Sequence, residues 1–248
     1  MSGHSKWSTI KRKKGAADAK RGQAFTRLAN AITIAAKEGG GDSTANVALR
    51  LAMDKARAEN MPNANIDRAI KRGTGELAGE KAPEQVTYEA YGPAGVAILV
   101  HCLTDNRNRT VSDVRSAITK RGGSLGETGS VGYLFANKGI IITKRDGVDA
   151  DSLMLAAIDA GAEDVEVENE VIEVQTPKQQ FMTVKGALEQ AGYPIESAEL
   201  ADIATTTVAV SDRQIANSVV GLLSDLEALD DVVSVSTNAD IEPDLVSG

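Results

Sequence analysis

Apolar residues recur every three to four positions in three stretches near the start of the chain, and this spacing predicts three short helices. The first runs over about 16–38, with Phe25, Leu28, Ala29, Ile32 and Ala36 on one face. Gly39-Gly40-Gly41 ends it, and Asp42 or Ser43 is expected to cap a second helix over about 44–60. Pro62 ends the second helix, and a third is predicted from Asn63 or Asn65 to about Arg72. Short helices with short connections predict a bundle.

The pattern changes from helical to alternating after Glu84. Residues 85–91 alternate, Gly92-Pro93 marks a turn, and 95–103 is strongly apolar, so a β-hairpin is predicted. A helix is predicted to follow as far as about Lys120, and a glycine-rich loop over 121–135 then leads into another strand.

Residues 139–210 predict the order β-α-β-β-α-β, which is typical of a ferredoxin-like module. A helix over 212–229 and a strand over 231–237 are then left over, whereas the elements before Gly139 lack a second helix and a last strand. We therefore expect this C-terminal pair to complete the earlier domain, with the ferredoxin-like module inserted in it. Residues 238–248 are expected to form a frayed tail.

The predicted fold class is therefore α+β, with an N-terminal three-helix bundle followed by two α+β domains, one ferredoxin-like and inserted in the other. The predicted limits are 1–80 for a basic arm with the bundle, 81–137 plus 209–240 for a discontinuous α+β domain, and 138–208 for the inserted acidic domain.

Charge is divided unevenly along a chain whose net charge is -8. Residues 1–75 carry fifteen basic and six acidic side chains (+9), residues 76–145 nine and seven (+2), and residues 146–248 three and twenty-two (−19). One end of the chain is therefore expected to approach nucleic acid, and the other to be repelled by phosphate.

The first 27 residues hold eight Lys or Arg against one acid, Asp18. Such a cluster around one large aromatic side chain suits a phosphate backbone with an unstacked base, which Trp7 is expected to stack on. A solvated basic tail explains the charge of this segment equally well. A second cationic face is predicted on the third helix. The candidate contacts in these two segments are Lys6, Trp7, Lys11, Arg12, Lys13, Lys14, Lys20, Arg21, Arg27, Arg68, Lys71 and Arg72.

The stretch TDNRNRT at 104–110 lies where a strand is predicted to pass into a helix. Backbone N–H groups without helical partners collect at such a junction, so Arg107 and Arg109 are further candidates for a phosphate or RNA contact. Spacing alone favours a simpler interpretation, in which the segment is a helix N-cap with solvated arginines.

The sequence gives little support for an enzyme. Cys102 is the only cysteine, which excludes an internal disulfide and fits a reducing, cytoplasmic compartment. His4 and His101 lack the spacing of metal ligands, and the glycines at 39–41 and 73–79 match neither a P-loop nor a dinucleotide motif. No apolar run is long enough to span a bilayer. We therefore predict no catalytic residue, no metal, no cofactor and no membrane association.

Several motifs occur in a fixed order along the chain: GHSKW (3–7), DAKRG (18–22), NMP (60–62) with IDRAIKRG (66–73), YEAYGPAG (88–95), TDNRNRT (104–110) and GSVGYLF (129–135). Together they resemble the YebC family, also called the YebC/PmpR transcriptional regulators, over nearly the whole chain. Ser8-Thr9 stands where the family pattern has Ala-Asn, and Lys13 stands where a histidine is common.

The resemblance implies three domains, one inserted in another, and a DNA-binding transcriptional regulator. It also implies an alternative, because some family members are ribosome-associated factors that help synthesis through proline-rich stretches, and a mitochondrial relative is a translational activator of cytochrome oxidase. The expected partner is thus DNA or ribosomal RNA, in the second case on the ribosome. A third interpretation makes the acidic domain a module that binds a protein partner.

Overall fold

The structure is a computed structural model that describes residues 21–77, 83–168, 170–242 and 245. The described chain forms two compact units. One is Phe135–Ile203, and the other consists of the described residues before and after that segment. Each unit is treated by itself below.

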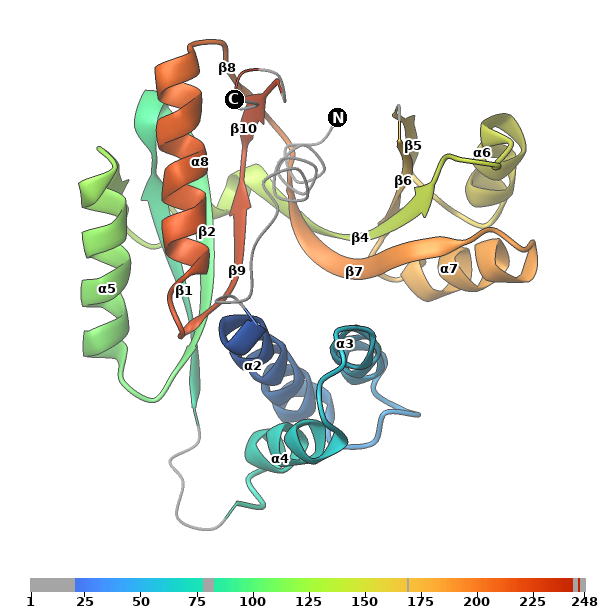
Figure 1. The fold of residues 1–248 in the computed structure, drawn as a ribbon, viewed down its shortest axis with the longest axis horizontal. Helices are drawn as coiled ribbons and strands as arrows, with labels where there is room; N and C mark the ends of the chain where they lie inside the picture. Colours follow the sequence, from blue (N-terminus) through green and yellow to red (C-terminus); the bar gives the residue numbers. More distant parts are fainter. Residues whose placement is uncertain (1–20, 78–82, 169, 243–244, 246–248) are drawn as a thin grey trace. The chain divides into compact units, whose positions relative to one another are not determined.

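The second unit opens with three helices, α2 (Arg21–Gly39), α3 (Val47–Ala58) and α4 (Asn63–Thr74), which form the predicted bundle (Figure 1). The apolar face predicted for the first helix packs inward: Leu28, Ile32 and Ala36 are buried, and Phe25 and Ala29 pack beside them. Leu49, Met53 and Ile66 from the other two helices complete the core. Helical periodicity therefore located this bundle correctly.

The cap of the second helix differs from the prediction, because Asn46 takes the role expected of Asp42 or Ser43. The Asn46 side chain accepts the Leu49 N–H at 3.0 Å and donates to the carbonyls of Ala35 (2.7 Å) and Gly40 (2.8 Å). Asp42 instead accepts from the backbone and hydroxyl of Thr44. An amide both donates and accepts, so Asn46 closes two helix ends at once, which a carboxylate cannot do.

A four-stranded sheet in the order β3-β1-β2-β9 follows the bundle. Its strands are β1 (Glu84–Tyr91), β2 (Ala97–Thr104), β3 (Ser124–Leu125) and β9 (Val232–Thr237), with the short helix η2 (Pro93–Gly95) in the β1–β2 turn. Helices α5 (Arg107–Lys120) and α8 (Arg213–Glu227) cover one face. They pack on Ile98, Val100 and Cys102 of β2. The antiparallel pairing of β9 with β2 confirms that the C-terminal helix and strand complete the earlier domain.

The expectation of a frayed tail after residue 237 is wrong for its first residues. Ala239–Ile241 form strand β10, which pairs in parallel with β8 (Val208–Val210), and Ala239 and Ile241 are buried in the same core. Asn238 directs this turn, since its side-chain oxygen accepts the Ala97 N–H at 2.7 Å. This short segment therefore continues the fold because its backbone pairs with β8 and two of its three side chains are buried.

The unit Phe135–Ile203 contains β4 (Phe135–Lys144), α6 (Ala150–Asp159), β5 (Asp164–Val167), β6 (Val171–Pro177), α7 (Phe181–Gln190) and most of β7 (Ile195–Ala204). Its sheet order is β5-β6-β4-β7, the ferredoxin-like order predicted from the β-α-β-β-α-β pattern. Both helices lie on the same side of the sheet in Figure 1.

The chain leaves the larger unit at Leu134, which ends the short helix η3 (Gly132–Leu134), and returns to it at Ala204. The carbonyl of Leu134 accepts hydrogen bonds from the backbone N–H (2.8 Å) and the hydroxyl (3.0 Å) of Thr205. The predicted α+β fold, with one module inserted in another, is thus confirmed. The predicted domain limits of 1–80, 81–137 plus 209–240, and 138–208 stay a prediction.

Candidate nucleic-acid interface

Helix α4 presents the cationic face predicted for the bundle. Ile66 and Ala69 turn into the core, whereas Arg68 and Lys71 are exposed and Arg72 is half-buried. Lys71 and Arg72 lie in the last turn, where a positive charge also favours the helix because the carbonyl ends of its peptide dipoles gather there. Arg68, Lys71 and Arg72 are therefore the predicted contacts that lie at the surface of the bundle.

Arg27 is placed differently from the other candidates. Its side chain is mostly buried and lies 3.8 Å from the Glu227 carboxylate of α8. Nearby, the Asn30 side chain donates to the carbonyl of Asp230 at 3.3 Å. Arg27 therefore belongs to a contact between α2 and the end of α8, and its role toward nucleic acid stays a prediction.

The densest group of candidates lies outside the described residues. These are Lys6, Trp7, Lys11, Arg12, Lys13, Lys14 and Lys20. Arg21 opens α2, but its side chain is not described. All of these positions remain sequence-based predictions.

The junction at 104–110 is a capped helix start, as its spacing favoured. Asn106 is the N-cap of α5 and accepts the Arg109 N–H at 3.1 Å, while its own N–H donates to the Thr104 hydroxyl at 2.9 Å. Arg107, the first residue of the helix, is exposed, and its backbone carbonyl lies 3.5 Å from the Tyr88 hydroxyl. The Arg107 guanidinium is thus directed to solvent beside a helix N-terminus.

The Arg109 side chain forms ion pairs with two carboxylates. Its Nη2 atom donates to both oxygens of Asp231 (2.9 and 3.0 Å) and to Asp105 (3.1 Å). The hydrogen bonds and charge of Asp231 raise the pKa of the Arg109 guanidinium, which stays charged in any case. Two carboxylates offset its charge, so Arg109 attracts a phosphate less strongly than Arg107 does.

Asp231 links the loop before β9 to the end of β2 and to the start of α5, which are far from it in the sequence. Besides Arg109, its carboxylate accepts from the hydroxyls of Thr110 (2.7 Å) and Thr104 (3.2 Å). The Asp231 carbonyl also accepts the Leu103 N–H at 2.9 Å. The start of α5 is therefore held against the loop between α8 and β9.

A buried carboxylate organises the glycine-rich loop. Glu89 of β1 is 8% exposed and accepts backbone N–H groups from Gly129 (2.6 Å), Val131 (2.6 Å) and Gly132 (2.7 Å). Burial by itself raises the pKa of this carboxyl, but the backbone N–H donors outweigh burial and leave the pKa below its usual value. Tyr91 adds a hydrogen bond to the Ser130 carbonyl at 2.9 Å.

These contacts show residues that sequence reasoning missed. Glu89 and Asp231 both lie in predicted strands, 85–91 and 231–237, and neither is among the predicted functional residues. A signal for Glu89 was present, because GETGSVG supplies backbone N–H groups with no strand or helix to pair them. Asp231 had no comparable signal, since its partners are more than 120 residues away along the chain.

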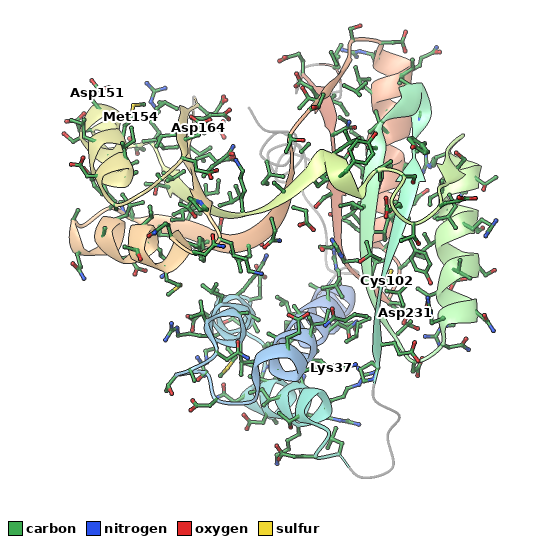
Figure 2. All side chains as sticks on the ribbon, turned by 180° about the vertical axis from the view of Figure 1, so that it is seen from behind. Lys37, Cys102, Asp151, Met154, Asp164 and Asp231 are labelled. Atoms are coloured by element: carbon green, nitrogen blue, oxygen red, sulfur yellow. The ribbon has the colours of Figure 1, made fainter. Side chains whose placement is uncertain are left out.

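Strand β2 carries a cysteine and a histidine. Cys102 is buried, and burial, followed by the charge of Asp231, raises the pKa of its thiol to about 12 (Figure 2). The His101 ring lies 3.0 Å from the Thr87 hydroxyl. Among the described residues, no group of three or more His, Cys, Asp or Glu side chains is placed to hold a metal ion. In the same part of the chain, no helix combines the length and apolar character needed to cross a membrane.

Comparison with known proteins agrees with the predicted resemblance. Residues 5–76 match the TACO1/YebC protein N-terminal domain, and residues 83–239 match the TACO1/YebC second and third domain. The chain is 54% identical over 241 residues to a probable transcriptional regulatory protein of Geobacter sulfurreducens, covering 97% of this chain and 96% of the relative. It is 52% identical over 249 residues to one of Rubrobacter xylanophilus, covering 100% and 98%.

A solved structure is also similar. The crystal structure of a conserved hypothetical protein from Aquifex aeolicus superposes with a TM-score of 0.82 at 45% sequence identity, covering 91% of this chain and 92% of that one. Sequence and fold thus agree from the bundle through both sheet-containing parts, and the chain belongs to the TACO1/YebC family.

Proposed function

We propose that this protein is a non-enzymatic regulator of gene expression that binds nucleic acid through its basic N-terminal part. The observation that carries the proposal is the separation of charge, +9 over residues 1–75 against −19 over residues 146–248. Relatives named probable transcriptional regulatory proteins support a regulator at the level of the family.

The proposed interface has two parts. Lysines and arginines of the arm contact phosphates, and Arg68, Lys71 and Arg72 of α4 extend that contact over the bundle. Contacts of this kind give strong salt dependence and little sequence information. We also assign Arg107 a phosphate contact at the start of α5, with Arg109 mainly holding Asp231 in place.

Titration of labelled nucleic acid at several salt concentrations tests the proposal. The Lys13→Ala, Lys14→Ala double variant is compared with Lys144→Ala, Lys178→Ala, which removes the same charge from exposed positions of the acidic unit. If both arm lysines contact phosphates, the slope of log affinity against log salt for duplex DNA falls by about 2. Equal slopes for the two double variants, with circular dichroism unchanged, contradict the assigned role of the arm.

A translation factor on the ribosome is the second candidate. The observation that favours it is Trp7 among the cations of the arm, because folded RNA offers unpaired bases for stacking that duplex DNA does not. The arm is then expected to enter ribosomal RNA and to assist synthesis of proline-rich stretches, in the cytoplasm.

Sedimentation of lysate through a sucrose cushion separates the two candidates. The full chain is compared with a chain lacking residues 1–14, at low and moderate salt and after nuclease treatment that spares ribosomes. Full chain that sediments with ribosomes, with truncated chain left in the supernatant, supports the translation factor. Full chain that stays in the supernatant but binds promoter DNA above competitor supports the transcriptional regulator.

A further inference from the structure

Helix α6 turns two large apolar side chains toward solvent. Leu155 is 65% exposed and Ile158 is 53% exposed, and their spacing of three residues places them on one side of the helix. The opposite side packs inward through Leu153 and Ala157, which are fully buried. A single exposed leucine is ordinary, but an adjacent pair begins a continuous apolar patch.

The neighbouring edge strand carries another exposed apolar side chain. Strand β5 is at the end of the sheet order and pairs with β6 alone among the described strands. Val167 lies opposite Ile172, so it projects from the face that α6 and α7 cover, yet it is 37% exposed. Helix α6 packs beside β5, as both views of the unit show. The outer edge of β5 also leaves backbone groups open to a partner.

Acidic side chains flank Leu155 on α6, since exposed Asp151 and Asp159 lie one helical turn to either side of it. Figure 2 shows Asp151 and Met154 of α6 and Asp164 of β5 along the same side of the unit. The unit as a whole carries fourteen Asp or Glu against five Lys or Arg. We call this area the α6–β5 surface, defined by Asp151, Met154, Leu155, Ile158, Asp159 and Val167.

We propose that the α6–β5 surface docks a cationic amphipathic segment of a partner protein. Burying Leu155, Ile158 and Val167 requires apolar side chains on the partner, and the acidic rim requires lysines or arginines between them. Nucleic acid carries the wrong charge for this surface. A second copy of the chain, docked symmetrically, brings acid against acid.

The apolar and acidic residues have different tasks in this complex. Apolar side chains supply most of the affinity because they leave water on docking. The rim carboxylates accelerate encounter with a cationic partner and select against acidic ones. Met154 is half-buried and flexible, so it can adapt to apolar side chains of different shape. This surface lies outside the proposed nucleic-acid interface, and the inference stands independently of it.

The first test uses the full chain and a labelled 14-residue peptide of Lys and Leu, with Leu at helical spacing. A scrambled peptide of the same composition controls for charge alone. We expect one peptide per chain and tighter binding of the ordered than of the scrambled sequence. Leu155→Ser with Ile158→Ser should weaken binding of the ordered peptide at least about tenfold. Tyr133→Ser removes another strongly exposed large side chain, 75% exposed, and should leave binding unchanged.

Equal binding of the two peptides, or unchanged binding by the Leu155→Ser, Ile158→Ser variant, overturns the proposal. Both side chains are mostly exposed, so the variant is expected to fold, and circular dichroism with a thermal melt checks this. Hydrogen–deuterium exchange of the full chain locates the bound peptide. Protection over 150–168 supports the α6–β5 surface, whereas protection confined to β7 contradicts it.

Discussion

Replacing Glu89 should show how far one buried carboxylate holds the glycine-rich loop. Glu89→Ala removes the acceptor of three backbone N–H groups and leaves them without this partner, that of Val131 buried and those of Gly129 and Gly132 partly buried. A buried polar group without a partner costs about 1–3 kcal/mol, and water entering the space left by the side chain recovers part of this. We expect a loss of about 3–5 kcal/mol in the free energy of unfolding. Glu89→Gln retains one acceptor oxygen and should cost about 1–3 kcal/mol.

The pH dependence of stability provides an independent check that Glu89 is ionised in the folded protein. The folded-state pKa of Glu89 is lowered from the reference value of 4.5, so its ionised form is favoured by folding. The resulting stability is fully present above pH 4.5 and is lost as the pH falls through the folded-state pKa. The stability difference between the native sequence and Glu89→Gln should therefore be largest near neutral pH and should narrow below pH 4.5.

Urea unfolding followed by circular dichroism at pH 7 and pH 3.5 measures these differences. Glu127→Gln is the matched control, because Glu127 is an exposed acid of the same loop and should change stability by less than about 0.5 kcal/mol. Hydrogen–deuterium exchange should become faster at 129–132 in both Glu89 variants. A Glu89→Gln protein as stable as the native one at pH 7, or a difference that does not narrow in acid, would refute the reasoning.

Three further variants and one reagent test the packing. Gly73→Ala should lower the free energy of unfolding by about 1–3 kcal/mol, because a methyl group there meets the Thr33 carbonyl and Ala36. Gly186→Ala has open space and should raise it by up to about 1 kcal/mol. Thermal melts compare the two variants. Asp231→Ala should cost about 2–4 kcal/mol in urea unfolding, since two threonine hydroxyls lose a carboxylate acceptor and Arg109 keeps only Asp105; a loss below about 0.5 kcal/mol, the size of an ordinary surface change, contradicts this. Cys102, with a thiol pKa of about 12, should resist iodoacetamide at pH 8 until urea unfolds the chain, as mass spectrometry can report.

The order of elements could be predicted from the sequence because it depends on local periodicity. Apolar residues mark the buried face of each element, at helical spacing from Phe25 to Ala36 and at alternate positions over 85–91. The insertion was predictable by counting elements, since a lone helix and strand at the end of the chain need a sheet to join.

Predictions that depend on long-range polar contacts were less successful. Asn46 caps α3 because the carbonyls of Ala35 and Gly40 arrive from another helix, and local spacing favoured Asp42 or Ser43 instead. Ala239–Ile241 form a strand because Val208–Val210 lies beside them, and three residues are too few to predict that pairing from local periodicity. Arg109 matched a phosphate contact by residue type, and its engagement with Asp231 is visible only in three dimensions.

The hydrogen bonds between Leu134 and Thr205 mark the place where this fold can lose or exchange its inserted segment. They place the two ends of the segment 135–203 within a single peptide's reach of each other. A tight turn could therefore replace all of that segment without displacing β9 from β2. Such a module can be gained, lost or exchanged through a single insertion or deletion in the gene. Its acidic surface can then diversify while the rest of the chain keeps its packing.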